Sequence, residues 1–271
     1  MDSENFAFLQ ETLKYLGFGG KLFFSDQFDQ KVAGEPKEFQ VSTDVFFDEE
    51  HRLDCTLHFR RSEQLNMYFF NKYEAKLDDG KGEDKERVQT FYISKGSGVT
   101  LKEAYNLLLG RAVNKDLTNA EGQKYNAWIQ LNFGEKDLNN NYKVRQFRQQ
   151  YGYDLEKTLE KYPILELKND ELRAGLIRSL KKGNMHTVSF EKKDRIEKMF
   201  IEASPQYKTI NIYPTGTKII RREVAKQAQA AEQAVVQDPL REGDKESPKE
   251  TKEEEIEGPV RRTARKAVMK G

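Results

Sequence analysis

The sequence predicts an α+β protein, in which antiparallel meander sheets pack against helices and a charged C-terminal tail is disordered. Three observations predict this. Several segments alternate apolar and polar side chains, which is typical of half-buried strands. Other segments carry apolar residues at helical spacing between capping residues and glycine stops. Beyond Tyr213 the chain has no Phe, Tyr or Trp, so this part can bury little apolar surface.

Helices are expected at the start of the chain. Residues 3–16 place apolar side chains at helical spacing, and Gly17 would end that helix. A short second helix is expected to hold Phe23, Phe24 and Phe28. The first of these helices is amphipathic.

Period-two patterns follow and predict a four-stranded antiparallel meander. Residues 39–45 and 52–59 alternate apolar and polar side chains around an acidic turn. A third strand is expected at 67–77 and a fourth at 87–93, with a charged loop between them. One face of this sheet needs a cover, and the N-terminal helices are the nearest elements that can supply it.

A capping box marks the next helix. Thr100 and Glu103 have the spacing at which each side chain bonds to the other residue's backbone N–H, so a helix is expected over 101–109. A strand at 125–133 and another at 142–147 should then form a hairpin, because the residues between them are rich in turn formers.

Two helices and three strands complete the folded part, at residues 154–162, 169–182, 185–190, 196–203 and 208–213. The order of helix, glycine and two strands after Gly110 recurs after Gly183, which indicates a weak internal repeat. We therefore expect three parts, which are helices and a meander in 1–98, helix-strand-strand repeats with a second sheet in 99–222, and a disordered charged tail in 223–271. The sequence does not decide whether the two sheets share one domain.

Composition limits the location and the partners. The formal net charge is +1, so binding to nucleic acid or anionic lipid would need a local patch. Residues 1–5 are polar and acidic where a secretory signal would be basic and then apolar. No stretch approaches the roughly 20 apolar residues that cross a bilayer. With Cys55 as its single cysteine the chain has no internal disulfide, so we expect a cytoplasmic protein without a membrane partner.

No preassembled reactive centre is evident. His51, His58 and His186 match no zinc-ligand spacing, and no Gly-x-Ser-x-Gly motif is present. Cys55 lies on the apolar face of an expected strand, where a thiol packs as a small hydrophobe. We therefore predict no catalytic residue, no metal site and no cofactor.

One glycine-rich loop could bind phosphate through backbone N–H groups, because it lies between a strand and a helix N-terminus. It consists of Lys95, Gly96, Ser97, Gly98 and Thr100. Against this role, Glu103 in the first helical turn competes with any anion, and a simple capped turn is the more common arrangement. A nucleotide- or phosphate-binding enzyme centred on this loop is the alternative to a pure binding protein.

The outward face of the meander is a second candidate. If Phe69, Tyr73, Ala75 and Leu77 point inward, alternation along the strand turns other side chains outward beside Arg60, with Tyr92 as a further candidate. These outward side chains are Tyr68, Phe70, Lys72 and Lys76. Aromatic rings among Lys and Arg on an open sheet can stack single-stranded bases and contact their phosphates. The alternative is that a helix or a partner covers Tyr68 and Phe70.

The extreme C-terminus is a third candidate. It is basic, with Arg261, Arg262, Arg265 and Lys266. A cationic peptide can contact phosphates or an acidic protein surface, or only keep the chain soluble. The acidic run at 250–257 could neutralise it.

Five segments of the sequence resemble a family of unknown function that is encoded on bacterial conjugative and integrative mobile elements. They are residues 66–73, 89–93, 110–113, 125–128 and 207–211, and the resemblance covers most of residues 1–222. It implies no catalytic residues. We therefore expect a non-enzymatic accessory or binding protein of a mobile element that contacts nucleic acid or a protein partner. A protein-interaction scaffold is the remaining alternative.

Overall fold

The computed structural model describes residues 3–19, 26–48, 51–78, 86–94, 98–193 and 195–215. Its helices are α1 (Ser3–Leu16), α2 (Asp26–Ala33), α3 (Leu101–Leu108), α4 (Leu155–Leu159) and α5 (Asp170–Lys181). Its strands are β1 (Glu38–Phe46), β2 (Arg52–Arg61), β3 (Tyr68–Asp78), β4 (Arg87–Tyr92), β5 (Val113–Thr118), β6 (Lys124–Lys136), β7 (Tyr142–Arg148), β8 (His186–Lys192), β9 (Arg195–Ser204) and β10 (Thr209–Pro214).

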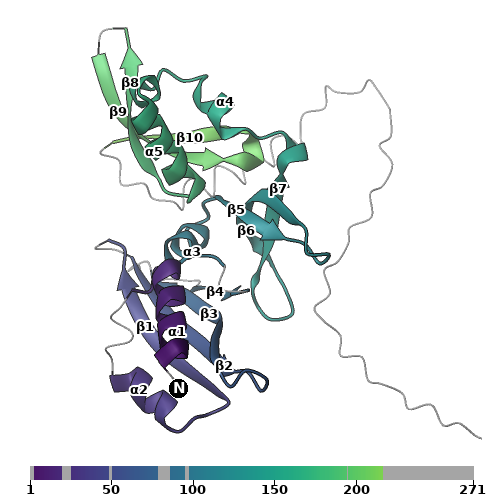
Figure 1. Ribbon diagram of the computed structural model, residues 1–271. Coiled ribbons are helices and arrows are strands. Elements are labelled where there is room, and N and C mark those ends of the chain that lie inside the picture. Colours follow the sequence, from purple (N-terminus) through teal and green to yellow (C-terminus); the bar gives the residue numbers. More distant parts are fainter. Residues whose placement is uncertain are drawn as a thin grey trace, which may run out of the picture. The chain divides into compact units, whose positions relative to one another are not determined.

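The strands form three antiparallel sheets, ordered β1-β2-β3-β4, β5-β6-β7 and β10-β9-β8 (Figure 1). The α+β class and the four-stranded meander are thus confirmed. Phe23, Phe24 and the tail at 223–271 lie outside the described residues. Within those residues, no helix is both long and apolar enough to pass through a bilayer.

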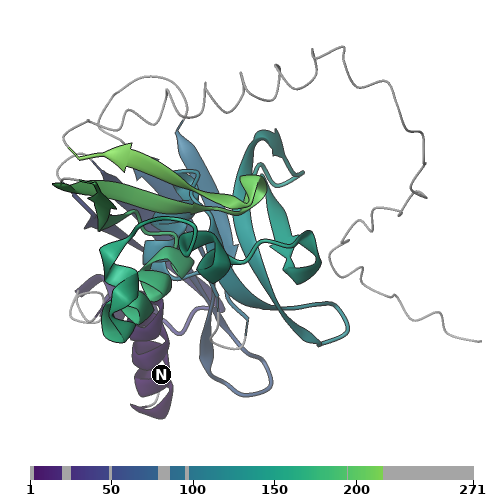
Figure 2. The same cartoon turned by 90° about the horizontal axis from the view of Figure 1, so that it is seen from above.

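The first sheet is covered on one face by helices. Figures 1 and 2 show α1 lying along this sheet and α5 lying along the β8–β10 sheet. Leu9, Leu13 and Leu16 of α1 are fully buried in the first core. Aromatic rings fill much of the remaining space, as in the stack of Phe39 on Phe59 at 4.8 Å between ring centroids. The helical cover expected from the sequence is therefore present.

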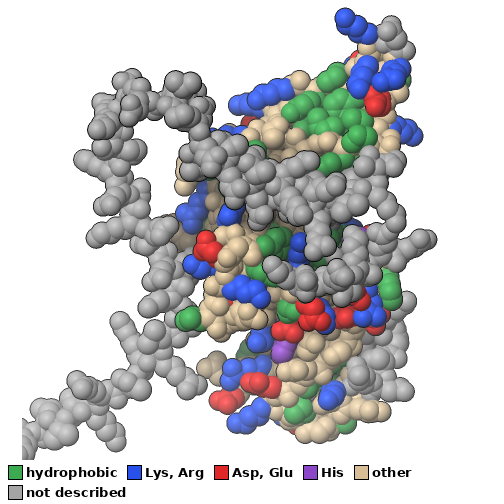
Figure 3. All heavy atoms as spheres, turned by 180° about the vertical axis from the view of Figure 1, so that it is seen from behind, with side chains coloured by type: hydrophobic (Ala, Val, Ile, Leu, Met, Phe, Trp, Pro, Cys, Tyr) green, Lys and Arg blue, Asp and Glu red, His purple; other side chains and the backbone are tan. Residues whose placement is uncertain are grey.

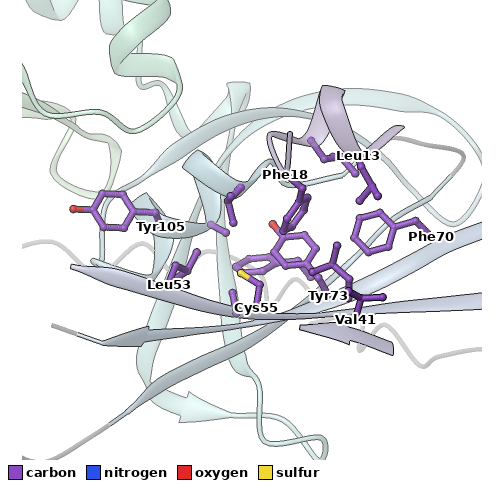
Figure 4. Packing of buried hydrophobic residues seen from close by; sticks show 14 of the residues in the cluster. Leu13, Phe18, Val41, Leu53, Cys55, Phe70, Tyr73 and Tyr105 are labelled. Carbon is purple, nitrogen blue, oxygen red and sulfur yellow. The ribbon is translucent and has the colours of Figure 1, made fainter. Parts of the chain in front are cut away.

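A β-bulge in β3 changes which side chains face this core. His58 of β2 lies opposite Lys72, but the next residue, Phe59, lies opposite Phe70, so Asn71 is the extra residue. An extra residue reverses the alternation of side chains along a strand. Phe70 and Tyr73 therefore lie on the same side of the sheet (Figure 4).

The bulge makes the predicted orientation of Tyr68 and Phe70 wrong. Their exposed fractions are 2% and 4%. Asn5 of α1 holds the backbone of Tyr68 through two 2.8 Å bonds, because its side chain donates to the carbonyl and accepts from the N–H. The Tyr68 hydroxyl donates to the Pro36 carbonyl at 2.7 Å. Both rings belong to the core, which leaves them unable to stack a base.

The predicted recurrence of helix, glycine and strands is present in a larger form. α3 is followed by Gly110 and the β5–β7 sheet, and α5 is followed by Gly183 and the β8–β10 sheet. The strands after Gly183 match the three that were predicted, whereas those after Gly110 are three and not two, because β5 was not predicted.

The middle sheet contributes to two hydrophobic cores. Ile129 and Leu131 of β6 pack into the first core with the β1–β4 sheet, whereas Trp128 packs into the second core with α5 and the β8–β10 sheet. Ala112 likewise packs into the second core, and its neighbour Val113 packs into the first. The described residues accordingly fall into one compact unit.

Buried polar groups join α3 to the C-terminal elements. Asn106 is fully buried, and its amide donates to the Lys182 carbonyl at 2.7 Å and to Asn184 Oδ1 at 2.9 Å. Arg111 Nη1 donates to Asn106 Oδ1 at 2.9 Å, and Arg111 Nε lies 3.5 Å from Glu202 Oε2. These contacts fix the chain between the two cores.

Gly183 is required at this junction. Its φ is +77°, and a Cβ there would lie 2.8 Å from the Ala112 carbonyl oxygen. We expect Gly183→Ala to lower the free energy of unfolding by about 1–3 kcal/mol from the backbone conformation alone. Gly175→Ala is the control, because Gly175 lies inside α5 with nothing within 4 Å of its Cβ position. It should raise stability by up to about 1 kcal/mol. Equal effects in urea unfolding would contradict this assignment.

Candidate nucleic-acid interface

The outward face of the first sheet keeps its predicted cations and the exposed ring of Tyr92, which lies opposite Lys72, but not the rings of Tyr68 and Phe70. Lys76 Nζ lies 2.5 Å from Glu86 Oε1, and Arg60 Nε lies 3.5 Å from Glu38 Oε1. Seen from behind, in the lower part of the molecule, Lys and Arg side chains are mixed with Asp and Glu (Figure 3). The aromatic-basic face predicted from the sequence is therefore not formed here.

The described part of the glycine-rich loop is a capped helix start. Lys95, Gly96 and Ser97 lie outside the described residues. The Thr100 backbone N–H donates to Glu103 Oε2 at 2.8 Å, and the Glu103 N–H donates to Thr100 Oγ1 at 3.4 Å, which confirms the capping box.

Lys115 completes this arrangement. Its ammonium group donates to Glu103 Oε2 and to the Gly98 carbonyl, both at 3.0 Å. A Cβ on Gly98 would lie 2.5 Å from Ile93 Cδ1, the end of a side chain that can shift, and 3.1 Å from the Tyr92 carbonyl oxygen. A carboxylate paired with a lysine thus occupies the helix N-terminus that an incoming phosphate would need.

The histidines lie apart from one another. His51 Nδ1 is 2.7 Å from Asp48 Oδ1, to whose other oxygen the Tyr105 hydroxyl donates at 3.0 Å. His186 Nδ1 is 3.0 Å from Ser179 Oγ. Within the described ranges, no three His, Cys, Asp or Glu side chains are grouped as a metal site would require. Arg261, Arg262, Arg265 and Lys266 lie outside those ranges.

Cys55 is buried, and burial followed by the charge of Asp54 raises the pKa of its thiol from 9.0 to about 12. We expect thiol reagents at pH 8 to modify the native protein at least about 1000-fold more slowly than the urea-unfolded chain, because the thiolate is the reactive form. Comparable rates in the two states would show that the strand face is open.

Because the folded pKa of the Cys55 thiol is higher than its unfolded pKa, this group also makes the free energy of unfolding fall as the pH rises from 9 towards 12.

The structure reveals a basic-aromatic surface that the sequence reasoning missed. Among the strands that the structure describes, β7 lies at the edge of its sheet and pairs with β6 alone. Its two ends are anchored, Tyr142 in the first core and Phe147 in the second, while the residues between them are exposed. We define the β7 surface by five side chains around this edge strand: Tyr125 and Arg148 on one face of the sheet, and Arg145, Tyr151 and Lys208 on the side of Phe147.

One half of the β7 surface is built on β6 and β7. The guanidinium carbon of Arg148 lies 4.5 Å from the centre of the Tyr125 ring. The Tyr125 hydroxyl donates to Gln146 Oε1 at 3.0 Å, which fixes the ring beside the strand. A guanidinium against a ring is a planar cationic platform.

The other half is built from segments distant in sequence. Arg145 donates from Nη1 to Gln206 Oε1 at 3.2 Å, and the Tyr151 hydroxyl donates to the Gln206 carbonyl at 2.7 Å. Lys208 Nζ lies 4.7 Å from the centre of the Tyr151 ring. Lys208 reaches this position from a left-handed backbone conformation, with φ of 53°, directly after the turn at Pro205–Tyr207.

The charge of the β7 surface is not neutralised locally. Arg145, Arg148 and Lys208 form no ion pair with any residue of the ranges that the structure describes, whereas neighbouring Lys143 is paired with Glu135 at 3.3 Å. Residues 142–153 contain no Asp or Glu. Unpaired cations beside tyrosine rings are the elements that contact phosphates and bases of nucleic acid.

A sequence signal for part of this surface existed. Lys143 and Arg145 lie in the strand expected at 142–147, Arg148 follows directly after it, and no acidic residue lies between Lys143 and Asp154. The simpler role of such charges is to keep an edge strand from pairing with another sheet. That role explains the charge but not the rings against which Arg148 and Lys208 lie.

Comparison with known proteins provides no assignment: no protein-family model matches the chain, and neither the curated proteins nor the solved structures include a significant match.

Proposed function

We propose that the protein is a non-enzymatic, cytoplasmic accessory protein of a bacterial mobile element that binds single-stranded nucleic acid on the β7 surface. The observation that supports this most is the set of three cations that have no carboxylate partner within the described part of the chain, two of them held against tyrosine rings. The resemblance to a family of mobile elements supports the setting, because the transfer of such elements handles nucleic acid.

Single strands fit this surface better than a duplex. Rings and guanidinium planes can stack on a base only where the base is unpaired. Arg145 and Arg148 are three positions apart in β7, so their side chains leave opposite faces of the sheet, Arg148 on the face of Gln146 and Arg145 on the face of Phe147. A bound strand would cross the edge of β7 to reach both cations, and its contacts would be with phosphates and base faces, which favours binding with little sequence preference.

The test is equilibrium binding of a fluorescent single-stranded oligonucleotide at low salt. We expect Arg145→Gln combined with Arg148→Gln to weaken binding at least tenfold. Each substitution removes a phosphate contact, and with it the counterion release that favours binding. The control is Lys168→Gln combined with Arg173→Gln, which changes the net charge equally but removes cations paired with Glu191 and Glu160. An equal loss in the control, or no binding by the wild type, would contradict the proposal.

The tyrosines should act separately from the charges. Tyr151→Leu removes a ring that is 37% exposed, and we expect it to cost about 1–3 kcal/mol of binding free energy if a base stacks there. The salt dependence of binding should stay as in the wild type, because no cation is removed. A changed salt dependence with unchanged affinity would show that Tyr151 only positions Lys208.

A further inference from the structure

A separate open groove lies on the first sheet, at the bulge in β3. Its volume is about 670 Å³, and its lining includes Lys31, His58, Arg60, Asn71 and Lys72. None of these residues belongs to the β7 surface. Two of them, Arg60 and Lys72, are cations that the sequence singled out for the outward face of this sheet.

The bulge accounts for the position of the groove. Asn71 is the extra residue of β3, and the sheet bends where a strand carries such a residue. Next to it, Lys72 lies opposite His58, which in turn lies opposite Gln40 of β1. Three strands thus bring amide, imidazole and ammonium groups to one row beside the bend.

The groove has an excess of positive charge. Glu38 is its acidic lining residue and lies 3.5 Å from Arg60, but both side chains are about two-thirds exposed, at 67% and 66%. Such an exposed pair contributes little. Lys31 and Lys72 make no ion pair or hydrogen bond with the residues that the structure describes. Burial, followed by the charge of Lys72, lowers the pKa of His58, while the charges of Glu74 and Glu38 oppose this shift.

We infer that this groove binds a phosphate group. Arg60 can donate two parallel N–H bonds to phosphate oxygens, and Lys72 supplies a compact charge beside them. The amide of Asn71 adds neutral donors at the bend. The phosphate comes from a small phosphorylated molecule or from the backbone of a bound strand, and the two sources share this chemistry.

The test is a titration of the full chain with inorganic phosphate, followed through the backbone amide signals of His58, Asn71 and Lys72. We expect saturable shifts with a dissociation constant of about 1 mM. Arg60→Gln combined with Lys72→Gln should weaken binding at least tenfold. Lys76→Gln is the matched control, because Lys76 lies on the same strand but pairs with Glu86 outside the groove lining.

Two results would overturn this inference: no shift in the wild type up to about 10 mM phosphate, or an equal loss of binding in Lys76→Gln. A short oligonucleotide that displaces phosphate identifies strand phosphate as the source, and failure to displace it identifies a small molecule. Arg145→Gln combined with Arg148→Gln should leave phosphate binding unchanged. The proposal for the groove and the proposal for the β7 surface can therefore be contradicted independently of each other.

Discussion

Replacing Arg111 by alanine should lower the free energy of unfolding by about 3–5 kcal/mol, the usual cost of leaving one partner of a buried ion pair alone. The Arg111 and Glu202 side chains are 8% and 14% exposed. Burial lowers the pKa of Arg111, and the charge of Glu202 opposes that effect. Without the guanidinium group, the Glu202 carboxylate would lose its ion-pair partner, while the Tyr213 hydroxyl and the Asn211 amide would still donate to its Oε1.

Urea unfolding of four proteins measures this effect. The wild type, Arg111→Ala, Glu202→Gln and the double variant form a thermodynamic cycle, in which the double variant should lose less stability than the sum of the single losses. If Arg111→Ala stays within about 0.5 kcal/mol of the wild type, as surface substitutions do, the junction between the two cores does not depend on this pair.

Phe70→Ala should cost about 3–5 kcal/mol of unfolding free energy, because it removes a ring from a packed core. Phe70 packs against Phe59 at 5.2 Å and Phe18 at 5.8 Å between ring centroids. The adjacent Phe69 lies on the other side of β3 and is partly exposed. Phe69→Ala is therefore the matched control, with an expected cost near about 1 kcal/mol.

The comparison tests the bulge itself. Both variants remove the same ring from the same strand, so their difference reports which ring faces the core. If Phe69→Ala proves the more costly, β3 has no reversal at Asn71, and Tyr68 and Phe70 return to the outward face on which the sequence placed them.

Most elements could be predicted because their side chains alternate or recur with a clear period. β5 could not, since Val113–Thr118 contains mainly polar residues and pairs only with β6. Its conformation depends on its partner strand and not on its own composition. The orientation of Tyr68 and Phe70 was missed for a different reason. Residues 67–70 are all apolar or aromatic, so alternation gives no sign of where the phase reverses.

The β7 surface shows the same limit. Arg145 and Arg148 are visible as cations in a strand, but Tyr125, Tyr151 and Lys208 come from three other segments. Their proximity depends on the pairing of β6 with β7 and on the left-handed turn at Lys208. Neither feature has a period in the sequence that would reveal it.

The salt dependence of single-strand binding tests the central claim most directly. With Arg145, Arg148 and Lys208 in contact with phosphates, the slope of log K against log salt concentration should be about −2, since each phosphate contact contributes about −0.7. Removing Arg145 and Arg148 should reduce the slope to about −0.7. A slope that stays near its wild-type value in this variant would show that nucleic acid does not bind at the β7 surface.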